Sequence, residues 1–131
     1  MRGRGRDPKR SVERYLAEVL NGSNPGSAGE LIANETLGQR VSSFRTAFPD
    51  VEVTTHHLLA EGDLVAVHLS GHGTHEGLFQ GCPPTGRPWT ATCTAIYRVD
   101  DGRIVDGRVN WDLLAVMEQL GVIRRADTVS A

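Results

Sequence analysis

Residues 89–111 read WTATCTAIYRVDDGRIVDGRVNW, and this stretch decides the fold of the 131-residue chain. Apolar and polar side chains alternate on both sides of the turn DDG (100–102), which is the pattern of two antiparallel strands joined by a hairpin. Residues 51–59 and 63–72 alternate or are rich in β-branched side chains in the same way. The sequence therefore predicts four strands joined in succession by hairpins.

The first fifty residues follow a helical period instead. Apolar residues recur there at i, i+3, i+4, i+7 and i+8, and the dipeptide NG ends the run. These residues are Val12, Tyr15, Leu16, Val19 and Leu20. Ser27 and Glu30 match a capping box, which predicts a short second helix. A third helix is expected over residues 37–48, and a last one from Asp112, its N-cap, to Gly121.

Helices followed by strands are typical of an α+β fold, in which the helices cover one face of an antiparallel sheet. A curved sheet closed on one side by helices leaves a hollow, which is a natural site for a small molecule. We expect one domain over residues 11–124. A disordered basic arm over residues 1–10 is expected before it, and a flexible tail over residues 125–131 after it.

Composition argues against several classes of protein. No apolar run approaches the roughly 18 residues of a membrane span, so we expect a cytoplasmic protein without membrane contact. The net charge is −2 although the first ten residues are strongly basic, so the body is acidic and no nucleic-acid binding is expected. Cys82 and Cys93 lack CxxC spacing, which predicts free thiols. His68 and His72 would lie about 13 Å apart on an extended strand, so no metal is expected.

Three motifs in the C-terminal half carry a resemblance to a known family. They are GTHEGLFQGCPPTGR (73–87), DDGRIVDGRVNWD (100–112) and MEQLG (117–121). In these motifs the chain resembles the SnoaL-like polyketide cyclase family of the NTF2-like superfamily. The resemblance implies the NTF2-like cone, a curved antiparallel or mixed sheet covered on its concave face by helices. It also implies a homodimer or higher homo-oligomer that pairs through the outer face of the sheet.

The chain departs from the cyclase members of that family at three positions. In those members an aspartate serves as acid and base in an aldol condensation, and a histidine holds or polarises the carbonyl. Matched without gaps, the aspartate falls on Val109, the histidine on Ala95 and a second histidine on Gly107. None of the three side chains can move a proton. The chain is in this respect similar to the proposed hydroxylase branch of the family, which also lacks the acid/base pair.

The resemblance implies a tailoring enzyme of aromatic, anthracycline-type polyketide biosynthesis, either a hydroxylase or a hydroxylase component without bound cofactor. The sequence contains no dinucleotide fingerprint. Hydroxylation would therefore take a partner reductase with NADPH and molecular oxygen, or a reduced substrate that reacts directly with oxygen. Two alternatives stay open: a polyketide (aldol) cyclase with an atypical base, and a non-catalytic ligand-binding or dimerisation module.

Strand alternation indicates which side chains line the hollow. The expected lining residues are Cys93, Ala95, Tyr97, Val109 and Trp111. They make an apolar surface with a phenol and an indole, which either contacts a flat aromatic polyketide or fills the core. The polar residues Asp106, Arg108 and Asn110 are expected to face away from it.

Further candidates lie on other elements. Phe44 and Arg45 belong to the third helix, where the arginine either pairs with a ligand anion or is exposed. His57 shares parity with the apolar residues of its strand, so it is either a pocket histidine or a core or rim histidine. His75 either binds at the pocket mouth or holds its turn. Asp112 is a helix cap first, and with His57 it is a candidate catalytic base.

Overall fold

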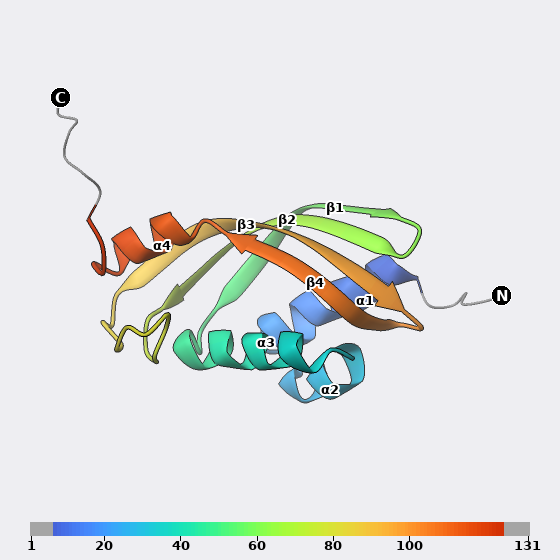
Figure 1. Ribbon diagram of the computed structural model, residues 1–131, viewed down its shortest axis with the longest axis horizontal. Helices are drawn as coiled ribbons and strands as arrows, with labels where there is room; N and C mark the ends of the chain where they lie inside the picture. The colour runs from blue at the N-terminus through green and yellow to red at the C-terminus, as the bar shows by residue number, and fades with distance from the viewer. Residues whose placement is uncertain (1–6, 125–131) are drawn as a thin grey trace, which may run out of the picture.

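The computed structural model describes residues 7–124 and contains a curved, four-stranded sheet in the order β1-β2-β3-β4 (Figure 1). The strands are β1 (Glu52–Glu61), β2 (Leu64–Thr74), β3 (Pro88–Asp100) and β4 (Arg103–Trp111). Every neighbouring pair is antiparallel, as successive hairpins require. The predicted α+β class and all four strands are confirmed, and the sheet is antiparallel throughout.

The helices of the first half of the chain lie against one face of the sheet (Figure 1). They are α1 (Pro8–Arg14), its π-helical continuation η1 (Tyr15–Leu20), the 3-10 turn η2 (Pro25–Ser27), α2 (Ala28–Leu31) and α3 (Glu35–Ala47). The last helix, α4 (Leu113–Gln119), follows β4 directly. No helix within residues 7–124 is long and apolar enough to cross a membrane.

Local capping differs from the sequence prediction at three helix starts. Asp7 caps α1 by accepting a hydrogen bond from the Lys9 amide. Residues 8–10, expected within a disordered arm, belong to the first helix, while residues 1–6 and the expected tail lie outside the described residues. The capping box is wrong, because the Ser27 hydroxyl donates to the Asn24 carbonyl and caps no amide. A cap that sequence analysis missed is Asn34, which accepts from the Leu37 amide at the start of α3.

The core lies between the helices and the concave face of the sheet. Along β3 every second side chain is buried, and the apolar stripe of α1 and η1 is also buried. The buried residues of β3 are Trp89, Ala91, Cys93, Ala95, Tyr97 and Val99. Each large apolar side chain removed from water contributes about 1.5–3 kcal/mol, so this two-layer core is what holds the helices on the sheet.

A β-bulge in β1 reverses the direction of the side chains after it. The register with β2 shifts between Thr55 and His57, and beyond the shift Leu58 packs on the core while Leu59 is 68% exposed. His57 consequently lies on the outer face of the sheet beside His68, with ring centroids 5.6 Å apart. The prediction that His57 enters the hollow is wrong, because one extra residue in a strand flips every side chain that follows.

Candidate ligand-binding pocket

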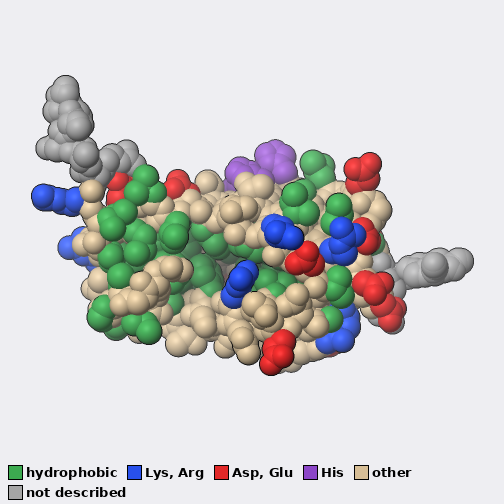
Figure 2. Space-filling model, viewed as in Figure 1, with side chains coloured by type: hydrophobic (Ala, Val, Ile, Leu, Met, Phe, Trp, Pro, Cys, Tyr) green, Lys and Arg blue, Asp and Glu red, His purple; other side chains and the backbone are tan. Residues whose placement is uncertain are grey.

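A cavity of about 760 Å³ opens between the concave face of the sheet and helix α3. This is within the range of pockets that hold drug-sized molecules. Its wall, called here the pocket wall, combines η1, α3 with the following Phe48, the inner faces of β2, β3 and β4, α4, and loop 75–87. Figure 2 shows hydrophobic side chains gathered around this hollow and toward the end of the molecule formed by α4 and the loop. The pocket wall is therefore built from segments distant in sequence.

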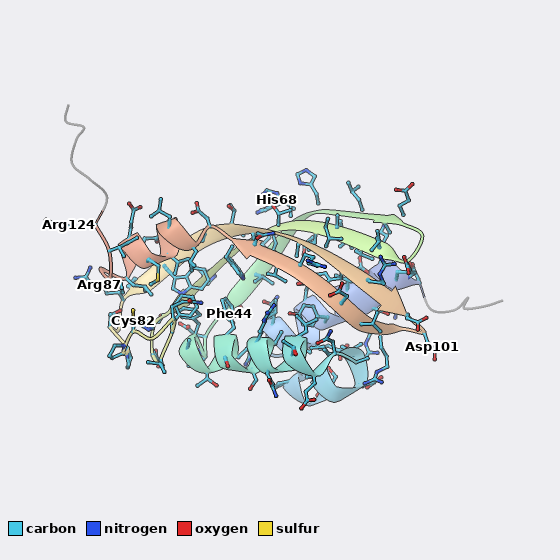
Figure 3. All side chains as sticks on the ribbon, in the orientation of Figure 1. Phe44, His68, Cys82, Arg87, Asp101 and Arg124 are labelled. Carbon is cyan, nitrogen blue, oxygen red and sulfur yellow. The ribbon has the colours of Figure 1, made fainter. Side chains whose placement is uncertain are left out.

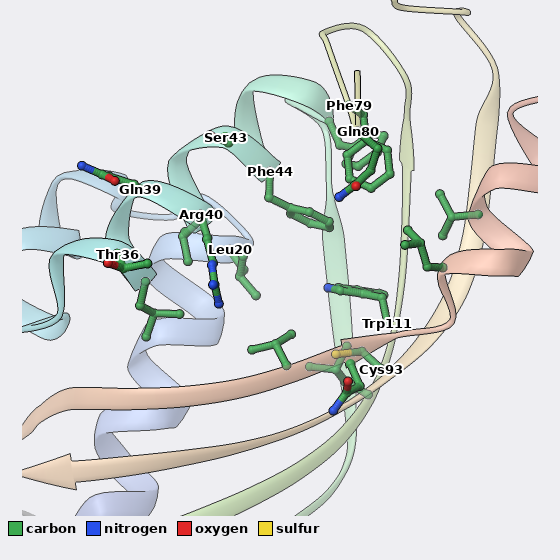
Figure 4. Close-up of a pocket in the computed structure, with 18 of the residues that line it drawn as sticks. Leu20, Thr36, Gln39, Arg40, Ser43, Phe44, Phe79, Gln80, Cys93 and Trp111 are labelled. Atoms are coloured by element: carbon green, nitrogen blue, oxygen red, sulfur yellow. The ribbon is translucent and has the colours of Figure 1, made fainter. Parts of the chain in front are cut away.

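One end of the pocket is aromatic. Phe44 of α3 and Trp111 of β4 lie nearly parallel, with ring centroids 5.3 Å apart and planes 19° apart. Trp89 of β3 meets Trp111 edge-on at 5.5 Å. Figure 4 shows the rings of Phe44 and Trp111 lying one over the other in the pocket, and Figure 3 places Phe44 between α3 and the sheet. Aromatic surfaces arranged in this way favour stacking by a flat ring system.

Gly71 of β2 makes room for this aromatic end. A Cβ at position 71 would lie 2.8 Å from Cη2 of Trp111, closer than carbon atoms approach without something moving. The indole therefore rests against bare backbone. Glycine in a strand often marks such a close approach, and here it lets the edge of the Trp111 indole reach the backbone of β2.

A second part of the pocket wall carries two phenols. Tyr15 of η1 and Tyr97 of β3 are each 2% exposed, and their ring centroids are 5.5 Å apart. Burial raises the pKa of both hydroxyls above the usual value of 10. Burial likewise raises the pKa of the Cys93 thiol, to about 11. All three groups therefore hold their protons at neutral pH and cannot act as bases there.

The mouth of the pocket is polar. Thr36, Gln39, Arg40 and Ser43 of α3 line it, with Gln80 of loop 75–87. Arg40 points from α3 into the pocket in Figure 4. Within residues 7–124 the Arg40 guanidinium has no hydrogen bond or ion pair to another side chain, and no other charged side chain lines the wall. An exposed guanidinium at the edge of an apolar pocket suits a ligand anion.

Within the described residues the pocket wall contains no aspartate, glutamate or histidine. Val109 lines it and lies directly opposite Ala95 in the register of β3 and β4. Ala95 is buried on the same face of the sheet but is not part of the wall. The two positions that the resemblance matches to the aspartate and the histidine of the cyclases are thus adjacent here, and both are apolar.

Sequence and structure agree on most of the expected lining residues. Phe44, Cys93, Tyr97, Val109 and Trp111 line the pocket, whereas Arg45, His57, His75 and Ala95 do not. Of the polar residues expected to face away, Asn110 also contributes to the wall, next to Trp111. The strand residues were placed correctly because the bulge between β3 and β4 lies outside the segment that lines the pocket.

The prediction that Arg45 faces a ligand is not supported by its position. Its guanidinium donates to the Leu20 carbonyl at 2.6 Å and packs against Gly22. It therefore closes the C-terminal end of η1, where cations stabilise unpaired carbonyls. Successive helical residues differ by about 100°, so the neighbour of Phe44 points elsewhere and Arg40, one turn earlier, shares its face.

His75 holds the loop rather than lining the pocket. It is fully buried, packs against Phe48 and Phe79, and its Nδ1 accepts a hydrogen bond from the Thr85 amide at 3.1 Å. The His75 amide donates to the Arg87 carbonyl, which closes the loop at its base. Of the two roles considered for His75, the structure favours the structural one, and the loop it holds carries Phe79 into the pocket wall.

Asp112, the other candidate base, caps α4. Its carboxylate accepts from the Ala115 amide at 3.1 Å, and it is exposed and outside the pocket wall. The prediction of a helix cap is confirmed. Neither of the two candidate bases, Asp112 and His57, thus lines the cavity.

Sequence reasoning missed two functional candidates in this pocket. Arg40 could have been found from its i, i+4 spacing to Phe44, which places both on one face of α3. Tyr15 was read only as part of an apolar helix stripe, and no local signal shows that it meets Tyr97. The loop residues Leu78 and Phe79 were also missed, because loops lack the regular spacing of apolar residues that marks the buried face of a helix or strand.

Comparison with known proteins now assigns the family. The SnoaL-like polyketide cyclase family matches residues 6–120 of this chain. IdmH, a proposed polyketide cyclase from Streptomyces antibioticus, is 30% identical, with a TM-score of 0.69, and the match covers 88% of this chain and 99% of that one. The chain belongs to the SnoaL-like polyketide cyclase family.

More distant solved structures share the fold. AclR, a proposed hydroxylase from Streptomyces galilaeus, is 20% identical with a TM-score of 0.76, covering 95% of this chain and 87% of that one. A proposed SnoaL-like polyketide cyclase from Jannaschia sp. CCS1 is 23% identical with a TM-score of 0.77, covering 89% and 93%. No curated protein sequence matches the chain. The predicted NTF2-like cone is confirmed by these structures.

Proposed function

We propose that this protein is a tailoring enzyme of aromatic, anthracycline-type polyketide biosynthesis, acting as a hydroxylase or hydroxylase component that binds no cofactor of its own. The observation that carries the proposal is the pocket wall. It offers aromatic surface for a flat ring system, yet among the described residues it has no carboxylate or imidazole to perform an aldol cyclisation. Membership of the polyketide cyclase family supplies the substrate class.

The proposed reaction needs two electrons and one oxygen molecule. A partner reductase transfers a hydride from NADPH to the quinone-type ring, which also takes up one proton from solvent, and the reduced ring then reacts with molecular oxygen. One oxygen atom enters a C–H bond as a hydroxyl group and the other leaves as water, while NADPH becomes NADP⁺. The protein contributes by orienting the ring and excluding bulk water from it.

Cyclase activity is the second candidate, since IdmH, the relative at 30% identity, is named as a proposed polyketide cyclase. An aldol reaction needs a base beside the substrate at neutral pH. The titratable groups in the wall are Arg40, two phenols and one thiol, and burial raises the pKa of Tyr15, Tyr97 and Cys93. The two phenols and the thiol therefore keep their protons, so the pocket favours ring binding over enolisation. A silent ligand-binding module, or one that dimerises through the outer sheet face, is the third candidate.

Two incubations separate the three candidates. The purified protein is mixed with a linear polyketide ester precursor, and separately with an anthracyclinone, a quinone reductase and NADPH under labelled ¹⁸O₂. We expect no change in the first mixture, and in the second a product heavier by one labelled oxygen atom, as measured by mass spectrometry. Phe44→Ala should abolish this product, because it removes a stacking face. Cyclised ester in the first mixture would instead establish a cyclase. If neither mixture gave a product, the non-catalytic ligand-binding or dimerisation module would be the remaining candidate.

A further inference from the structure

The two tyrosines of this chain meet inside the pocket. Tyr15 is the first residue of the π-helix η1, and Tyr97 lies on the inner face of β3. Their rings meet edge-on, with centroids 5.5 Å apart and planes 64° apart, and both line the cavity. π-Helical turns occur frequently at functional sites. Here the π-helix sets the position of the first phenol.

The space around Tyr97 is shaped for its ring. Gly107 lies opposite it on β4, and a Cβ at position 107 would lie 3.0 Å from Cδ1 of Tyr97. A side-chain carbon of Leu37 in α3 also lies close to Gly107, 3.3 Å from the position of that Cβ. The ring is thus confined between a bare backbone and a helix, which fixes the direction of its hydroxyl group.

The two hydroxyl groups interact with each other and keep spare donor capacity. Burial is the largest influence on both phenols and raises the pKa of each, so both hydroxyls keep their protons. Among residues 7–124 neither hydroxyl has a hydrogen-bonding partner other than the second phenol. Because each hydroxyl has a single proton to donate and only one of the two can be used within the pair, at least one proton stays available to a ligand. A buried hydroxyl with an unused donor is costly unless a ligand or water accepts from it.

We propose that Tyr15 and Tyr97 form a neutral donor pair that binds one oxygen atom of the aromatic ligand, a carbonyl or phenol oxygen. This inference rests on the proposed function, because it takes the pocket to hold a flat oxygenated ring. Tyr15 donates to the ligand oxygen and Tyr97 supports Tyr15. Such a pair stabilises the oxygen further when it becomes negative, as it does when a quinone is reduced or a phenol ionises.

The test compares ligands with and without the oxygen atom. Binding of 9,10-anthraquinone and of anthracene is measured by quenching of tryptophan fluorescence for the wild type, Tyr15→Phe and Tyr97→Phe. We expect Tyr15→Phe to weaken binding of the quinone about 5–10-fold, the size of one net hydrogen bond, and to change anthracene binding less than twofold. Thr94→Val, which removes an outward-facing hydroxyl from the same strand as Tyr97, is the matched control.

A spectroscopic measurement separates direct contact from a structural effect. The bound phenol of 2-hydroxyanthraquinone is titrated by its absorption, and its apparent pKa should be roughly one unit lower in the wild type than in Tyr15→Phe. Circular dichroism checks that each variant is folded. If Tyr15→Phe is not folded, Tyr97→Phe is used to measure the same change in the pKa of the bound ligand. Equal quinone binding and an equal ligand pKa in wild type and variants would overturn the donor pair while leaving the ring pocket intact. Failure of both anthracene and anthraquinone to bind to the wild type would overturn the proposed function and the donor pair together.

Discussion

Gly107 and Tyr97 are cross-strand partners on β4 and β3, and the Tyr97 ring occupies the space that a side chain at position 107 would need. The resemblance to the cyclases puts a histidine at this position. Here the buried Tyr97 ring from the neighbouring strand occupies that space and brings a hydrogen-bond donor.

Gly107→His is expected to destabilise the protein without adding activity. The imidazole would displace the Tyr97 ring, and such overpacking costs about 1–3 kcal/mol. Urea denaturation measures the change in the free energy of unfolding. Gly38→Ala is the matched control, because a Cβ at Gly38 in α3 meets nothing within 4 Å and should stabilise by up to about 1 kcal/mol. Unchanged stability of Gly107→His would contradict the close packing of Tyr97.

Val109→Asp is expected not to create rapid cyclisation. Val109 is 39% exposed and faces Ala95, so the new carboxylate would be partly hydrated and would have no imidazole partner. A hydrated carboxylate keeps an ordinary pKa and is a weak base for an enolisation. Product formation from a polyketide ester, followed by mass spectrometry, checks this. Fast cyclisation by this single variant would show that a carboxylate at position 109 needs no histidine at position 95.

Arg40→Met should weaken binding of anionic rings selectively. Its guanidinium lies at the pocket mouth without an ion pair among the described residues, so a ligand carboxylate can approach it. We expect anthraquinone-2-carboxylate to bind about 3–10-fold more weakly, and neutral anthraquinone to bind as before. Isothermal titration calorimetry at two salt concentrations measures both. Arg108→Met, on the outer face of β4, controls for the loss of one positive charge; an equal effect of both variants would argue against direct contact.

His75→Phe should loosen loop 75–87. The phenyl ring can pack on Phe48 and Phe79, but the Thr85 amide loses its acceptor, which costs about 1–3 kcal/mol. Hydrogen exchange at the amide of Thr85 should become faster, and Tm should fall. His72→Gln, at an exposed position on the outer face, should change neither. Undiminished protection of the Thr85 amide would show that the loop does not depend on His75.

Asp50→Asn should lower the stability of the protein at neutral pH, and the variant should lose less stability than the wild type on acidification. The Thr74 hydroxyl and amide donate to the Asp50 carboxylate at 2.7 and 2.8 Å, which holds its pKa below the usual 3.8. The Asp50 carboxyl has a lower pKa in the folded protein than in the unfolded chain. Its contribution to stability is therefore complete above the pKa of the unfolded chain, and it is lost as the pH falls through the pKa of the folded protein. We expect Tm to fall by about 2–4 °C at pH 7. Thermal melts between pH 2 and pH 7 compare the variant with the wild type, and parallel curves would contradict the assignment.

Much of the fold could be predicted because its signals are local. The alternation in residues 89–111 fixed the faces of β3 and β4, and with them the positions of Cys93, Tyr97 and Trp111 on the pocket wall. The apolar stripe starting at Val12 identified the first helix in the same way. Patterns of period two or 3.6 survive folding because each element buries only one face.

Two site predictions failed because the local sequence does not show a strand bulge or the rotation of a helix about its axis. The bulge after Thr55 moved His57 to the outer face, and nothing in the local sequence marks that extra residue. Arg45 was expected near the ligand, but Arg40 lines the pocket, because the rotation of α3 about its axis depends on how the helix packs on the sheet. Both are decisions of tertiary packing.

The sequence alone places alkyl side chains, Ala95 and Val109, at the two positions that the resemblance matches to the histidine and the aspartate of the cyclases, and no fold can give an alkyl side chain a proton to transfer. Only the tertiary structure decided that Tyr15 meets Tyr97 beside that apolar pair. Their contact joins the first helix to the third strand, and it depends on a π-helical turn and a cross-strand glycine. Long-range packing selects such features, since their local cost is offset only when the whole core assembles.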